Sequence, residues 1–177
     1  LFNNTGISST ELKVLAHHAR QRGRDSSGLV YLSDEQFNVD KADYDIKKLI
    51  RRRKTSSSPF VLGHSRLITN GLGDNQPVVR DNVIVIHNGI IINHDELWEE
   101  TGLQRNLEVD SEIIAALAKS HIDNGGKIND LPHIVLSQCK GTISAAVVVP
   151  SIGKVVIFSN NGSLYVGQNG QNSYFSS

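Results

Sequence analysis

Three short polar clusters stand out in the sequence, each placed where an expected strand ends or an expected helix begins. They are RLITNG (66–71), HNG (87–89) and DSE (110–112). In the first cluster, the Arg66 guanidinium can hold a carboxylate through two parallel hydrogen bonds, and Thr69 adds a hydroxyl donor. In the third, the Asp110 carboxylate can accept hydrogen bonds from an ammonium group. Together these side chains predict a site for a free amino acid.

The middle cluster, HNG (87–89), offers amide N–H donors at the end of an expected strand. Four β-branched residues (83–86) predict a strand that is buried on both faces, and this strand runs directly into His87, Asn88 and Gly89. We expect the strand to stop there, because Asn followed by Gly favours a turn with positive φ. Two interpretations are open. The segment is either a hairpin turn, or a pair of donors, the Asn88 amide and the Gly89 N–H, aimed at a developing oxyanion.

Each of these residues also has an ordinary structural explanation when it is taken singly. Arg66 fits a surface ion pair, and Thr69 fits a turn. Asp110 fits the N-cap of a helix, with Glu112 two residues later to favour the helix dipole. The basic run Lys47–Lys54 likewise fits the solvated end of a helix at least as well as a phosphate site.

The elements that must position these clusters include both helices and strands. Helical spacing and end signals predict helices over 8–23, with Gly23 as the C-cap, 93–100, 109–125 and 131–139, and a weaker one within 41–54. Strands are expected at 27–32, near 36–39, at 60–67 and 83–86, and in a final meander of four runs after residue 141. This order predicts an α+β sandwich in which helices cover packed sheets.

Length and composition limit the class of protein. The 177 residues fit one domain, and Lys plus Arg equals Asp plus Glu at 18 each, so no global field attracts nucleic acid or an anionic membrane. The single cysteine, Cys139, excludes an internal disulfide and a CxxC metal site. No apolar run approaches the roughly 18 residues that span a bilayer. We therefore expect a cytoplasmic domain with neutral or small partners, no cofactor and no metal.

The order of the motifs adds weight to the single residues. The segments RGRDSSG, GHSRLITNG, NQP, HNGIIIN, VDSE and KGTISAAVVV follow one another along the chain. This set resembles the glutaminase domain of the class II glutamine amidotransferases, which are N-terminal nucleophile (Ntn) hydrolases. The resemblance runs from about Leu12 to Ser177. It implies a four-layer α/β/β/α sandwich of two mainly antiparallel sheets, with residues 1–177 forming one glutaminase domain.

The resemblance also implies which residues bind the substrate, L-glutamine. Arg66 and Thr69 bind its α-carboxylate, and Asn70 lies beside them. Asp110 and the Gly89 carbonyl hold its α-ammonium group.

A second set of roles concerns the hydrolysis of the glutamine side chain. The Asn88 amide and the Gly89 N–H form the oxyanion hole, and Arg22 braces the site. Members of the family use an N-terminal cysteine whose thiolate attacks the side-chain amide, with the free α-amino group as the base. Ammonia leaves toward a separate acceptor synthase domain, a thioester forms, and water then releases glutamate.

The sequence departs from this pattern at its first residue. Residue 1 is Leu1, and the chain contains no methionine, so we expect the nucleophilic cysteine to precede Leu1 in the natural protein. We expect the chain to be inactive as a glutaminase without it, because Cys139 lacks an α-amino base and fits a buried thiol.

Two other functions are open. A module that has lost its nucleophile can sense glutamine or regulate an attached synthase. An unrelated α+β interaction domain would use the three clusters only as turns and caps. The ammonia acceptor and the oligomeric state do not follow from the sequence.

Overall fold

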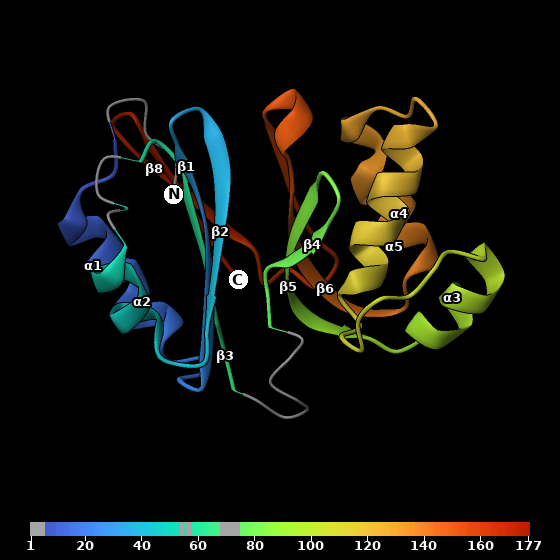
Figure 1. The fold of residues 1–177 in the computed structure, drawn as a ribbon, viewed down its shortest axis with the longest axis horizontal. Coiled ribbons are helices and arrows are strands. Elements are labelled where there is room, and N and C mark those ends of the chain that lie inside the picture. Colours follow the sequence, from blue (N-terminus) through green and yellow to red (C-terminus); the bar gives the residue numbers. More distant parts are fainter. Residues whose placement is uncertain (1–5, 54, 56–57, 68–74) are drawn as a thin grey trace. The chain divides into compact units, whose positions relative to one another are not determined.

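Residues 6–53, 55, 58–67 and 75–177 are described by the structure, which is a computed structural model. The chain divides into two units (Figure 1). The first unit comprises Leu1–Pro77 and Tyr165–Ser176, and the second comprises Val78–Leu164 with Ser177.

The first unit is built on a three-stranded antiparallel sheet in the order β2-β1-β3. Its elements are α1 (Ser9–Ala19), β1 (Ser26–Ser33), β2 (Gln36–Ala42), α2 (Ile46–Arg52), β3 (Val61–Arg66) and a separate hairpin of β8 (Tyr165–Asn169) and β9 (Asn172–Ser176). Figure 1 shows α1 and α2 against one face of the sheet. Apolar side chains of both helices and of β1, such as Leu12, Ile46 and Leu29, form the core.

Helix α1 begins where the sequence predicts and ends earlier. The Glu11 N–H donates to Ser8 Oγ at 3.2 Å, and the Ser8 N–H donates to the Glu11 carboxylate at 3.0 Å, which completes a capping box. The helix ends at Ala19, with Arg20 as its C-cap. The prediction that Gly23 caps the helix is therefore wrong. Gly23 is buried against the backbone of β3, where a side chain has no room.

The β8–β9 hairpin is fastened to α1. The Tyr174 hydroxyl donates to the Glu11 carboxylate at 2.7 Å. This bond and those from Ser8 lower the pKa of Glu11 to about 2. The last four strands therefore do not form the single meander that the sequence predicts. In the described part of the chain, β8 and β9 pair with each other alone, and their hairpin is bonded to α1, near the other end of the chain.

The second unit is built on a four-stranded antiparallel sheet in the order β4-β5-β6-β7. Its elements are β4 (Val78–Arg80), β5 (Val83–Ile91), α3 (His94–Thr101), α4 (Glu112–Asp123), η1 (Ile128–Asp130), α5 (Leu131–Gln138), β6 (Gly141–Val149), η2 (Pro150–Ile152) and β7 (Lys154–Ser159). Residues 113–118 of α4 are all buried and pack with inward residues of the sheet such as Val85 and Val147. The short strand β4 is not predicted by the sequence pattern.

Strand β5 does not stop at His87–Gly89, so the expected strand end and the hairpin turn are both wrong. The strand continues to Ile91 because β6 pairs with it along its whole second half, from Asn88 opposite Ser144 to Ile91 opposite Gly141.

The expected α+β class with mainly antiparallel sheets is otherwise confirmed. The basic run forms α2 as far as Arg52, which agrees with a helix end. In the described part of the chain, none of the helices has the length and apolar character needed to cross a membrane.

Two glycines on adjacent strands of the first unit test the packing of its sheet. A Cβ on Gly28 would lie 2.1 Å from the Gln76 carbonyl oxygen, whereas a Cβ on Gly63 would meet the flexible end of the Ile46 side chain at 2.9 Å. We expect Gly28→Ala to lower the free energy of unfolding by about 2 kcal/mol or more, and Gly63→Ala to lower it by less than about 1 kcal/mol. Urea denaturation of both variants measures the difference, and equal losses would contradict this packing.

Candidate functional site

Gly89 is the one position of β5 where the strand requires glycine. Its φ is 144°, and a Cβ there would lie 1.9 Å from the Thr142 carbonyl oxygen. A side chain is therefore excluded both by the backbone conformation and by the neighbouring strand. The HNG motif contains glycine because two strands approach closely, not because the chain turns.

The hydrogen-bonding pattern of the sheet indicates where the Gly89 backbone points. Successive residues of an antiparallel strand direct their N–H and C=O groups to alternate sides. Ile143, opposite Gly89, receives the Asn160 N–H on its β7 side at 3.0 Å, so Gly89 faces away from β6. Among the described residues, β4 covers that side of β5 only from Val83 to Val85. The Gly89 N–H and carbonyl thus point to the edge of the sheet beyond β4.

Asp110 lies at that same edge. Its Oδ2 accepts the Ile91 N–H at 2.8 Å, and its Oδ1 accepts the Ser111 hydroxyl at 3.2 Å. The Asp110 side chain is half-buried. The structure therefore places Gly89 and Asp110 at one edge of the sheet in the second unit, and Asn88 directly precedes Gly89 in β5.

The N-cap interpretation of Asp110 is wrong. Helix α4 begins at Glu112, and its N-cap residue is Ser111, which makes no side-chain capping bond. Glu112 is also not a solvent-facing charge at the start of the helix, because it is only 1% exposed. Asp110 instead accepts the Ile91 N–H of β5, and Glu112 accepts the Leu107 N–H of the loop before the helix.

His87 contacts Ser111, the residue after Asp110, from the core. It is 2% exposed, and its Nδ1 lies 2.9 Å from Ser111 Oγ, while its Nε2 lies 3.3 Å from the Thr142 carbonyl. Burial lowers the pKa of His87, and the negative charge of Asp110 opposes this effect. Sequence reasoning assigned no role to His87 or Ser111, although both stand inside the motifs, next to Asn88 and Asp110.

Asn88 lies on the opposite face of β5 from His87, because side chains alternate along a strand. It is half-buried, and its neighbour across the sheet is Ser144. Its Nδ2 donates a long hydrogen bond to Ser177 Oγ at 3.4 Å. Ser144 in turn contacts Ser159 Oγ at 2.9 Å, so a row of polar side chains crosses this face.

Two further site residues belong to the first unit. Arg66 ends β3 and pairs with Ser26, and its side chain is half-buried. The Arg22 side chain is exposed. The backbone beside Arg22 passes close to Arg66 in space. A Cβ on Gly23, the residue after Arg22, would lie 2.1 Å from the Arg66 carbonyl carbon.

Thr69 and Asn70 lie outside the described residues. The convergence of Arg66 with Asn88 and Asp110 spans the two units and stays a prediction. Within the described residues, His, Cys, Asp and Glu side chains form no group of three or more that could hold a metal ion.

Comparison with known proteins identifies the family. A model of the glutamine amidotransferase domain matches residues 64–177, which is well over half of the chain. The chain belongs to the class II glutamine amidotransferase domains.

Relatives of known function share this domain as part of longer proteins. The glutamine–fructose-6-phosphate aminotransferase (isomerizing) of Bradyrhizobium diazoefficiens is 30% identical over 150 residues, which cover 80% of this chain and 25% of that protein. The enzyme of the same name from Thermotoga maritima is 29% identical over 153 residues, with 80% and 25% covered. This amidotransferase domain thus spans about a quarter of the length of these relatives.

Solved structures of amidotransferases share the fold. Glutamine phosphoribosylpyrophosphate amidotransferase from B. subtilis, complexed with ADP and GMP, matches 95% of this chain and 39% of its own, with a TM-score of 0.75 and 21% identity. A structure described as the allosteric regulatory enzyme of purine biosynthesis matches 93% and 38%, with a TM-score of 0.73 and 22% identity. These matches confirm the expected fold class, an α+β fold of Ntn-hydrolase type with two mainly antiparallel sheets.

Cys139 is a buried thiol, as the sequence predicts. It is 4% exposed at the C-terminal end of α5. Burial raises the pKa of Cys139 to about 12, and the negative charge of Asp110 adds to the effect. Because the thiolate is the reactive form, this cysteine is a poor nucleophile in the folded domain.

The reactivity of Cys139 can be measured directly. We expect the native chain to react with Ellman's reagent at about pH 8 at least roughly a hundredfold more slowly than the chain in concentrated guanidinium chloride, because unfolding restores an ordinary thiol pKa and exposure. Absorbance of the released thionitrobenzoate gives both rates. Rapid modification of the native protein, with circular dichroism unchanged, would show that Cys139 is accessible.

Proposed function

We propose that this domain binds L-glutamine as the glutaminase part of an amidotransferase. The observation that carries the proposal is the hydrogen bond between Asp110 and the Ile91 N–H, which places a carboxylate at the sheet edge toward which Gly89 points. Glutamine has an ammonium group and a side-chain amide on one short carbon stem. A carboxylate beside backbone and amide donors is complementary to both ends of that stem.

Each site residue has one role in this proposal. Asp110 and the Gly89 carbonyl accept hydrogen bonds from the α-ammonium group. The Asn88 amide and the Gly89 N–H donate to the oxygen of the substrate side chain, where negative charge develops as a nucleophile attacks. Arg66 binds the α-carboxylate through a bidentate ion pair.

The remaining roles concern the residues around Arg66. Thr69 and Asn70 add polar contacts to the α-carboxylate. Arg22 braces the site, and the backbone of Gly23, the residue after it, lies close to the backbone of Arg66.

The chemistry proposed for the active protein is glutamine hydrolysis through a thioester. A cysteine thiolate attacks the side-chain carbonyl carbon, and the bond from that carbon to nitrogen breaks after the nitrogen receives a proton from the cysteine's own α-ammonium group. Ammonia passes to an acceptor synthase domain, and water cleaves the thioester to give glutamate. Within the 177 residues the single cysteine is the buried Cys139, so we propose that these residues alone bind glutamine without hydrolysing it.

Glutamine binding is the first test of this function. Isothermal titration calorimetry of the 177-residue chain should show heat on addition of L-glutamine, and Asp110→Asn should weaken the affinity by about 10- to 100-fold, since a charged hydrogen bond to the ammonium is lost. Asp123→Asn, an exposed acid on α4, is the matched control and should bind as the unaltered chain does. A coupled glutamate assay should detect no steady product.

Absence of binding heat and of thermal stabilisation at millimolar L-glutamine would favour an interaction domain instead. Steady glutamate release from these 177 residues would contradict the assignment of the nucleophile. Binding without catalysis in every natural form of the protein would favour a glutamine sensor.

The oxyanion role of Asn88 needs a form of the protein that hydrolyses glutamine. In such a form, Asn88→Ala should lower kcat by about 10² to 10³, because one donor to the developing charge is removed. The value of KM should change much less, since this interaction strengthens only in the transition state. Initial rates of glutamate release measure both constants, and a fall in kcat of less than about tenfold would contradict the role.

A further inference from the structure

The loop that leads into Asp110 is held from inside by a buried carboxylate. Glu112 is the first residue of α4, and its side chain folds back over the preceding loop. Glu112 Oε2 accepts the Leu107 N–H at 2.8 Å and the Asn106 N–H at 3.0 Å. The segment 106–112 is thereby closed into a ring, and Asp110 lies within this ring.

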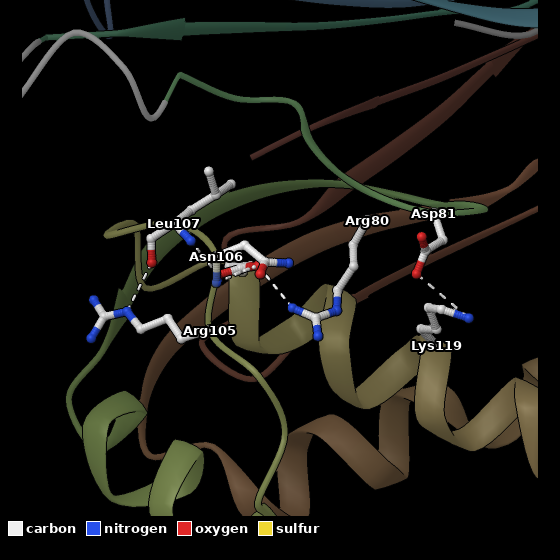
Figure 2. A network of polar contacts seen from close by, with 7 residues as sticks. Arg80, Asp81, Arg105, Asn106, Leu107 and Lys119 are labelled. Atoms are coloured by element: carbon white, nitrogen blue, oxygen red, sulfur yellow. Dashed lines mark hydrogen bonds and ion pairs between the residues drawn. The ribbon is translucent and has the colours of Figure 1, made fainter.

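Arg80 neutralises this carboxylate and joins it to the sheet. Its Nη1 donates to Glu112 Oε1 at 2.8 Å, and Figure 2 shows Arg80 reaching toward the loop from its strand. The two side chains are 14% and 2% exposed, so the ion pair is largely removed from water. The guanidinium also lies 5.8 Å from the centre of the Trp98 ring. Because Arg80 belongs to β4, the pair ties the loop to the strand beside β5.

Arg105 holds the same loop from the solvent side. Its Nε donates to the Leu107 carbonyl at 2.8 Å (Figure 2). Its Nη2 donates to the Glu108 carbonyl, also at 2.8 Å. Its Nη1 donates to Asp95 of α3 at 2.7 Å. The loop is therefore fixed to the sheet on one side and to α3 on the other.

We propose that this loop clamp, formed by Glu112, Arg80 and Arg105, positions Asp110 for the α-ammonium group of glutamine. The inference rests on the proposed function and adds positioning residues that touch no substrate. Replacing a buried ion pair by well-packed apolar side chains of similar volume is often neutral or stabilising. Apolar side chains cannot accept the two N–H groups that close the ring, so the charges serve the shape of the loop.

The clamp should act on one end of the substrate only. A hydrogen bond between a carboxylate and an ammonium group weakens steeply when its distance or angle changes. A displaced Asp110 therefore loses the ammonium contact. The contacts proposed for Asn88 and Gly89 depend on the pairing of β5 with β6, which the clamp does not touch.

The experiment compares two ligands by calorimetry on the 177-residue chain. These are L-glutamine and glutaramate, which is glutamine without its α-amino group. We expect Glu112→Gln to weaken L-glutamine binding about tenfold and to change glutaramate binding by less than about twofold. The double variant Asp110→Asn/Glu112→Gln should bind L-glutamine as weakly as Asp110→Asn alone, because Glu112 acts through Asp110.

Two further variants separate positioning from folding. Arg105→Ala loosens the same loop without leaving a buried charge, and it should weaken L-glutamine binding selectively by about threefold. Lys119 of α4 pairs with Asp81 (Figure 2) and with Asp123. Lys119→Gln removes this charge and should bind both ligands as the unaltered chain does. Thermal denaturation reports whether each variant is folded.

The outcomes are distinct. Unchanged L-glutamine affinity in both Glu112→Gln and Arg105→Ala, or an equal loss for both ligands, overturns the clamp and leaves the proposed function standing. An additive loss in the double variant also overturns it. If the unaltered chain binds no glutamine, the proposed function fails, and this inference fails with it.

Discussion

The hydrogen bond from the Ile91 N–H to the Asp110 carboxylate is the constraint on which the polar site of the second unit depends. It joins β5 to the segment before α4 at 2.8 Å. A charge-assisted bond of this kind contributes about 2 kcal/mol. It also gives a partner to a backbone N–H at the edge of the sheet, past the end of β4. One interaction thus completes the hydrogen bonding of a strand and places a negative charge beside Gly89.

The start of α4 carries two carboxylates close together, and the structure compensates each differently. Asp110 accepts a strand N–H and a hydroxyl and remains half-buried, which leaves it able to meet a ligand. Glu112 is buried and is matched by Arg80 and two backbone N–H groups. The positive end of the helix dipole favours both charges. The arrangement separates a carboxylate that supports the loop from one that is available for binding.

Local patterns predicted most of the elements, because capping and periodicity act within a few residues. Ser8 caps α1 within the predicted helix start, and the predicted apolar stripe of α4 is the centre of a core. The wrong predictions concern positions where the local structure depends on a strand from a distant part of the sequence. At position 23 a side chain is excluded because β3 passes beside Gly23. Strand β5 continues through Asn88 and Gly89 because residues of β6 pair with it there. Strand β4 is too short to show a period of its own.

The sequence by itself determined the residue types, their order along the chain and, through that order, the family to which the domain belongs. The tertiary structure alone decided which of these residues meet. Asp110 and Ile91 are 19 positions apart, and Arg80 and Glu112 are 32 apart, so neither contact leaves a periodic signal in the chain. Whether an acidic residue caps a helix, supports a loop or stays available to a ligand depends on which groups surround it after packing. Burial and hydrogen-bond partners are properties of the folded chain.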